Sequence, residues 1–126
     1  MAVIYPAPLR DGDVIAVISP ASIIEPDYVT GTVEVLRRHG WTPEVSRHAL
    51  GRHGSYSGSV DERLADLNDA ICDPAVRAIL CSRGGYGTVH LLDRFPKKAF
   101  MSDPKWIIGF SDISALHAMA SSMNVA

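Results

Sequence analysis

The sequence has few of the features that mark secreted or membrane proteins. Only two cysteines occur among its 126 residues, too few for a disulfide framework, and we interpret Cys72 and Cys81 as reduced, buried thiols. No apolar stretch approaches the roughly 20 residues of a membrane span. The N-terminus lacks a basic region followed by a long apolar core, so it shows no secretory signal. These absences predict a cytoplasmic protein without a membrane partner.

A strong charge bias and cofactor-binding patterns are also missing. The formal net charge is −2 at pH 7, which gives no reason to expect nucleic acid as a partner. No Cys/His spacing suggests a metal, no carboxylate pair stands out for acid–base work, and neither nucleotide-binding string, G-x-G-x-x-G or the P-loop, is present. We therefore expect no metal and no cofactor. The length and the 47% hydrophobic content are typical of one soluble globular domain.

Apolar runs alternate with helical patterns four times along the chain. The predicted strands are residues 14–18, 41–46, 76–81 and 106–110. Pro26 suits the first turn of one helix and Gly40 its C-terminal stop, while Ser59 with Glu62 fits a capping box that begins the next helix. This order predicts an α/β domain over residues 1–126, with a mostly parallel open sheet and helices on both faces.

The stretch around Ser111 is the strongest candidate for chemistry. An apolar run from Trp106 to Phe110 ends at this serine, and helical spacing follows. A serine between strand and helix has the setting of a nucleophile elbow, and the first amides of the helix would favour an anionic intermediate. The G-x-S-x-G string is incomplete because Ile113 replaces its second glycine. The alternative is that Ser111 only caps the helix, and the local sequence does not separate the two.

A second candidate is the turn Arg83-Gly84-Gly85-Tyr86-Gly87, which precedes a predicted helix carrying apolar residues, namely Val89, Leu91 and Leu92. Three interpretations compete. Glycines could form a phosphate cradle, although the nucleotide-binding strings are absent. An amide of Gly84 or Gly85 could form an oxyanion hole with the amide of Asp112, because both turns follow strands at the carboxyl edge of the sheet. The glycines could also only serve a tight turn that needs positive φ.

No residue of the chain supplies a convincing base for Ser111. His117 lies six residues further along the predicted helix, more than a turn away, and His90 also falls inside a helix. The other three histidines are typical of helix ends or loops, namely His39, His48 and His53. The residues alone therefore predict a nucleophile and an oxyanion hole without their base.

Four stretches of the sequence resemble the LD-carboxypeptidase family of serine peptidases, which includes the microcin-immunity peptidases. They are residues 9–22 (LRDGDVIAVISPAS), 58–68 (GSVDERLADLN), 79–87 (ILCSRGGYG) and 105–117 (KWIIGFSDISALH). The resemblance implies a flavodoxin-like N-terminal domain, with Ser111 as nucleophile and Asp112 with Gly84 or Gly85 as the oxyanion hole. It also implies removal of a terminal D-amino acid from murein tetrapeptides in cell-wall recycling, so that the partner is a peptide or muropeptide substrate.

The family's catalytic Glu and His lie in a C-terminal domain, and nothing in this sequence matches them. We therefore expect a catalytically incomplete chain with an apolar docking surface for that missing domain, and a homodimer. We expect Arg83 and Tyr86 to contact the substrate, Arg83 through a carboxylate, although a surface ion pair would equally explain it. The alternatives are a peptidase that gives resistance to microcin-type antibiotics, a non-catalytic peptide-binding module and a flavodoxin-like nucleotide binder.

Overall fold

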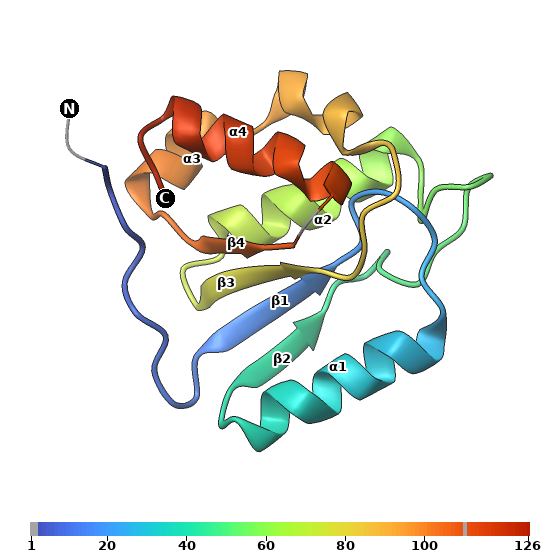
Figure 1. Cartoon of the computed structure of the whole chain (residues 1–126), viewed down its shortest axis with the longest axis horizontal. Helices are drawn as coiled ribbons and strands as arrows, with labels where there is room; N and C mark the ends of the chain where they lie inside the picture. Colours follow the sequence, from blue (N-terminus) through green and yellow to red (C-terminus); the bar gives the residue numbers. More distant parts are fainter. Residues whose placement is uncertain (1–2, 110) are drawn as a thin grey trace.

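The computed structural model describes residues 3–109 and 111–126, and its centre is a parallel β-sheet of four strands (Figure 1). In chain order the strands are β1 (Val14–Ile18), β2 (Thr42–Val45), β3 (Val76–Cys81) and β4 (Trp106–Ile108). They lie in the order β2-β1-β3-β4, and each neighbouring pair is parallel. The predicted parallel sheet is confirmed, and the carboxyl ends of β1, β3 and β4 share one edge. Phe110, predicted to end the last strand, lies outside the described residues.

Helices cover both faces of the sheet, as predicted. The α-helices are α1 (Pro26–Arg38), α2 (Val60–Cys72), α3 (Lys97–Ser102) and α4 (Ser114–Ser122). Helix α1 packs on one face, and the other three lie on the opposite face (Figure 1). Two predicted helix boundaries are confirmed, because Pro26 begins α1 and the Ser59 hydroxyl accepts from the Glu62 amide at 3.1 Å in a complete capping box. No helix of the described residues has the length and apolarity to cross a membrane.

The helix predicted after the glycine turn is a 3-10 helix, η1 (Thr88–Arg94), and a second one, η2 (Ser111–Ile113), precedes α4. Of the apolar residues that this segment carries, Val89 is 48% exposed while Leu91 is fully buried. The difference follows from geometry, since three residues per turn leave a narrower buried stripe than an α-helix.

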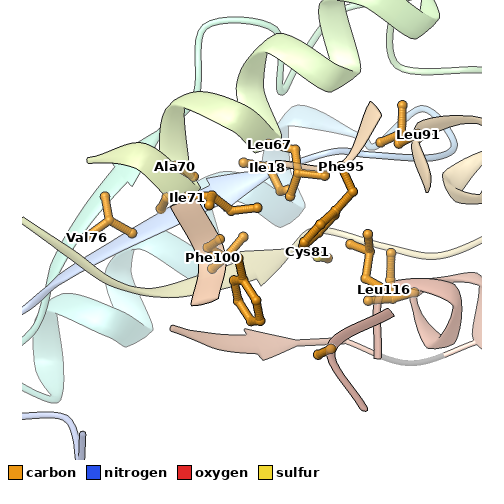
Figure 2. Close-up of a cluster of buried hydrophobic side chains, with 14 of the residues drawn as sticks. Ile18, Leu67, Ala70, Ile71, Val76, Cys81, Leu91, Phe95, Phe100 and Leu116 are labelled. Atoms are coloured by element: carbon orange, nitrogen blue, oxygen red, sulfur yellow. The ribbon is translucent and has the colours of Figure 1, made fainter. Parts of the chain in front are cut away.

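The main hydrophobic core fills the space between the sheet and helices α2, α3 and α4 (Figure 2). Phe95 and Phe100 meet there at nearly right angles, with ring centroids 5.5 Å apart. A smaller core under α1 contains Ile15, Val17, Leu36 and Ala78. Because α1 is the one helix on that face within the described ranges, an apolar groove of about 330 Å³ stays open beside β3 and β4, and Ile108 is 42% exposed.

The two ends of the described chain meet. Ile4 and Val125 form a parallel bridge, in which the Ile4 amide donates to the Asn124 carbonyl at 2.6 Å and the Ala126 amide donates to the Ile4 carbonyl at 2.8 Å. We call these contacts the terminal bridge. Further along the N-terminal segment, the Trp106 indole donates to the Ala7 carbonyl at 2.9 Å. The N-terminal segment is therefore fixed to the last helix and the last strand.

Both thiols are free, but the prediction that both are buried was wrong. Cys81 is buried at the end of β3, whereas Cys72 is exposed. Cys72 directly follows the buried Ile71, and one residue turns an α-helix by about 100°, which places the thiol outside the apolar stripe. The prediction for Cys72 was wrong because it used the residue type alone and not the position of the residue on the helix.

This difference predicts selective thiol labelling. Burial raises the pKa of the Cys81 thiol to about 12, so at pH 8 roughly one Cys81 in ten thousand is a thiolate. We expect a thiol-reactive reagent to label one cysteine in the native protein and two in guanidinium chloride. Mass mapping should place the native label on Cys72. Cys72→Ser is the control, and rapid native labelling of that variant would contradict the assignment.

Candidate active site

Ser111 occupies a strained backbone position at the end of β4. Its φ is 60°, in the left-handed region that costs a non-glycine residue roughly 1 kcal/mol or more. Two residues earlier, a Cβ at Gly109 would lie 2.8 Å from the Ile113 side chain, so the sharp turn needs glycine there. Ser111 is exposed, and its hydroxyl makes no hydrogen bond with any described residue. The capping alternative is therefore unsupported, because a cap would use this hydroxyl.

The glycine turn lies against the loop that follows β1. Gly85 and Gly87 have φ values of 103° and 116°, which confirms that the turn needs glycine at both positions. The Ser22 amide donates to the Gly84 carbonyl, and the Tyr86 amide donates to the Ser22 hydroxyl, each at 3.3 Å. Within the described residues, the amides of Gly84 and Gly85 have no acceptor. Of the two residues, Gly85 is exposed and Gly84 is buried.

A hydrogen bond joins the glycine turn to the turn at Ser111. The Thr88 amide, which directly follows Gly87, donates to Asp112 Oδ2 at 2.8 Å. This contact confirms that the two turns predicted to share the carboxyl edge lie together. The Thr88 hydroxyl is buried and has no partner among the described residues, and such an unsatisfied group costs about 1–3 kcal/mol. The corner between the two turns is therefore polar and incompletely paired.

Arg63 lies beneath both turns and was not predicted from the sequence. Its side chain is 2% exposed, although it belongs to a helix face predicted from the apolar residues around it, namely Val60, Leu64, Leu67 and Ile71. The guanidinium donates to backbone carbonyls of Gly58, Pro20 and Gly87 at 2.9–3.0 Å. Burial lowers the pKa of Arg63, and the nearby Tyr56 and Asp112 oppose this effect. The sequence did contain a signal for this buried arginine. Arg63 lies four residues before Leu67, on the apolar face of the predicted helix.

Buried serines fasten the loops at the same edge. The Ser19 hydroxyl donates to the Ala49 carbonyl at 2.7 Å and lies 2.6 Å from the Ser82 hydroxyl. The Ser57 hydroxyl donates to the Ser19 carbonyl. This network connects the ends of β1 and β3 with the loop before α2, so the edge that carries the site is cross-linked by hydrogen bonds. The sequence indicated the position of Ser19 but not these partners.

The two residues expected to contact substrate are both accessible. Arg83 is exposed and donates to the Ile23 carbonyl at 3.1 Å, and no carboxylate of the described residues pairs with it. Tyr86 is 59% exposed, and its ring centroid lies 5.5 Å from that of His90 and 6.4 Å from that of Tyr56. The ion-pair alternative for Arg83 is thus absent here, and its guanidinium remains open to solvent.

The histidines do not complete the site. His117 lies 3.0 Å from the Ile107 carbonyl through Nε2, which gives it a structural role. His90 belongs to the aromatic cluster, and His48 lies 3.4 Å from a Glu62 oxygen. Across the described ranges, no histidine hydrogen-bonds to Ser111 and no three His, Cys, Asp or Glu side chains gather as a metal site. No described histidine is therefore hydrogen-bonded as a base for Ser111.

Fold and site together define an α/β protein with an open parallel sheet and a strained, exposed serine at its carboxyl edge. The chain belongs to the LD-carboxypeptidase family, because the profile of the LD-carboxypeptidase N-terminal domain matches residues 15–126. This confirms the family predicted from the sequence.

Named relatives agree with this family. The chain is 39% identical over 103 residues to the murein tetrapeptide carboxypeptidase of Pseudomonas aeruginosa, covering 81% of this chain and 34% of that protein. It is 34% identical over 116 residues to the microcin C7 self-immunity protein MccF of Escherichia coli, covering 89% of this chain and 33% of that one. The crystal structure of an MccF-like protein from Bacillus anthracis superposes with a TM-score of 0.84 at 34% identity, covering 90% of this chain and 35% of that one. The chain thus spans about a third of the length of these proteins.

Proposed function

We propose that this chain supplies the nucleophile and the oxyanion hole of a cytoplasmic serine carboxypeptidase that removes the terminal D-amino acid from murein tetrapeptides. The observation that carries the proposal is the exposed Ser111, which has a φ of 60° and lies three residues after the end of β4. This position supports a nucleophile elbow, in which a sharp turn would lift the hydroxyl off the sheet. The similarity to the murein tetrapeptide carboxypeptidase supports the substrate class.

In the proposed reaction, Ser111 Oγ attacks the scissile carbonyl while a base takes its proton. The tetrahedral oxyanion is stabilised by the amide of Asp112 and that of Gly84 or Gly85. The terminal amino acid leaves, and water then hydrolyses the acyl-enzyme. The hydrogen bond from the Thr88 amide to Asp112, which joins the glycine turn to the Ser111 turn, supports this assignment. The exposed Arg83 guanidinium would bind a carboxylate of the peptide, with the Tyr86 ring beside it.

The base and its orienting acid are proposed to come from a second, C-terminal domain. Two observations support this division. No described histidine hydrogen-bonds to Ser111, and the matched relatives are about three times as long as the aligned region. The apolar groove beside β3 and β4 gives that domain a surface to cover. In its absence we expect the groove to favour self-association, as in the predicted homodimer.

A fusion protein tests the function directly. Residues 1–126 would be joined to the part of the Pseudomonas aeruginosa enzyme that follows its aligned region. We expect the fusion to release D-alanine from a murein tetrapeptide, and the isolated chain to release almost none, because a serine without a base is a poor nucleophile at neutral pH. The Pseudomonas segment alone is the control. A folded fusion without turnover would contradict the proposal.

The similarity to MccF favours a second candidate, a peptidase that cleaves a microcin-type antibiotic. One MccF structure that superposes on 98% of this chain, with a TM-score of 0.83, is a complex with aspartyl sulfamoyl adenosine. The same fusion can be assayed on an aminoacyl sulfamoyl nucleoside. Faster cleavage of that compound than of the tetrapeptide would favour the second candidate. A second fusion, with the C-terminal part taken from MccF in place of the Pseudomonas aeruginosa enzyme, then shows whether the preference belongs to this chain.

A further inference from the structure

A single peptide group connects Arg63 to the residue that follows the proposed nucleophile. The Gly87 carbonyl accepts from Arg63 Nη1 at 2.9 Å. The amide of the same peptide bond, that of Thr88, donates to Asp112 Oδ2 at 2.8 Å. Since the peptide group is planar and rigid, Arg63 and Asp112 hold opposite edges of one plane. Movement of one side chain must therefore tilt the group that the other one binds.

The Arg63 end of this linkage is fixed by three separate loops. Besides the Gly87 bond, Nε donates to the Gly58 carbonyl and Nη1 donates to the Pro20 carbonyl, both at 3.0 Å. The Tyr56 ring lies against the guanidinium, with 4.7 Å between the central carbon and the ring centroid. A planar guanidinium loses little freedom for each bond that it makes. Arg63 is thus a rigid anchor, unlike an exposed arginine in a surface ion pair.

The close approach of Arg63 also explains the glycine at position 87. A Cβ there would lie 2.8 Å from Arg63 Nη1 and 2.9 Å from the Tyr56 ring, and the φ of 116° already disfavours any side chain. The guanidinium therefore occupies the space of the missing side chain and holds the peptide directly. Asp112, at the other edge, is close enough for its charge to favour the charged form of Arg63.

We propose that Arg63 is a positioning residue of this site. Through the Gly87–Thr88 peptide it fixes Asp112, and thereby sets the position of the Ser111 turn relative to the glycine turn. The inference rests on the proposed function, because an oxyanion hole works when amides from both turns converge on one oxygen. Arg63 is buried beneath the turns and acts through its neighbours.

Amide hydrogen exchange of the 126-residue chain, followed by NMR, tests the linkage without any activity. We expect the Thr88 amide to exchange at least about tenfold faster in Arg63→Lys and in Asp112→Ala than in the native chain. The amides of Leu67 and Ile71 in α2 should change less than about threefold, which separates local loosening from global unfolding. Arg63→Lys is measured because it keeps the positive charge at this buried position. Arg63→Met, which removes the charge, can be added if that variant folds.

The matched control is Arg94→Lys. Arg94 pairs with Asp61 on the surface at 2.7 Å and lies in the same 3-10 helix as Thr88. We expect it to leave the exchange of the Thr88 amide unchanged. Unchanged exchange in Arg63→Lys, or an equal increase in Arg94→Lys, would overturn the linkage.

The second readout is kinetic and uses the fusion protein described above. Arg63→Lys should lower kcat by about tenfold or more and change KM by less than about threefold, because the oxyanion contacts matter most in the transition state. Faster Thr88 exchange with unchanged kcat would make Arg63 a structural residue and overturn the positioning role. A native fusion without turnover would instead reject the proposed function, and the positioning role with it, while the exchange data would still report on the linkage.

Discussion

Replacing Ser111 by alanine in the fusion protein is expected to lower kcat by about four to six orders of magnitude, as for other nucleophilic serines. Its hydroxyl makes no hydrogen bond with the described residues, so the substitution should have little effect on the free energy of unfolding. A capping serine would show the reverse pattern, with nearly normal activity and a loss of about 1 kcal/mol in stability. Measuring kcat and the urea midpoint on the same samples distinguishes the two roles.

Ser111→Gly sharpens this comparison. Glycine accepts a φ of 60° without strain, so we expect this variant to be more stable than the native chain by up to about 1 kcal/mol while it remains inactive. The control is Ser114→Ala, at the exposed first residue of α4, which should keep most of the activity. An active Ser111→Gly fusion would contradict the assignment of the nucleophile.

Gly87→Ala is expected to destabilise the isolated chain by at least about 2 kcal/mol. The positive φ alone costs alanine roughly 1–3 kcal/mol, and the new methyl group would also displace the Arg63 guanidinium. The measurement is urea unfolding followed by circular dichroism. The position is also informative because the same peptide group binds Asp112 on its other edge, so loss of stability and loss of activity should occur together.

Gly31→Ala provides the matched control for Gly87→Ala. Gly31 lies inside α1, its φ is outside the positive range, and a methyl group there meets no atom within 4 Å. Alanine should therefore stabilise the chain by about 0.5–1 kcal/mol. Equal effects of the two substitutions would show that neither the backbone conformation nor the contact with Arg63 matters at position 87.

The elements confirmed from the sequence are those with local signals. The run from Ala78 to Cys81 is continuously apolar because β3 is largely buried, and the parallel order of the strands follows from the helices between them. Ser59 and Glu62 are three residues apart, so their capping box is readable without any tertiary information. The strand before Ser111 and the helix after it were predicted for the same reason, although β4 ends at Ile108 and α4 begins only at Ser114.

The polar framework of the site could not be predicted in this way. Arg63 finds its three carbonyl acceptors in loops around positions 20, 58 and 87, and only the folded chain brings these loops together. The Ser19 and Ser82 hydroxyls are likewise 63 residues apart in sequence. From the sequence alone an arginine is predicted to be exposed, because the carbonyl groups that would accept its hydrogen bonds in the interior are not known.

The terminal bridge between Ile4 and Val125 bears on the order of folding. It closes a ring of nearly the whole described chain, and loop-closure entropy makes such distant contacts late to form. The capping box of α2 and the turn after β3 are local and should form much earlier. Val125 is 2% exposed and belongs to the main hydrophobic core. The bridge between Ile4 and Val125 is therefore expected to form only after the sheet and its helices are in place.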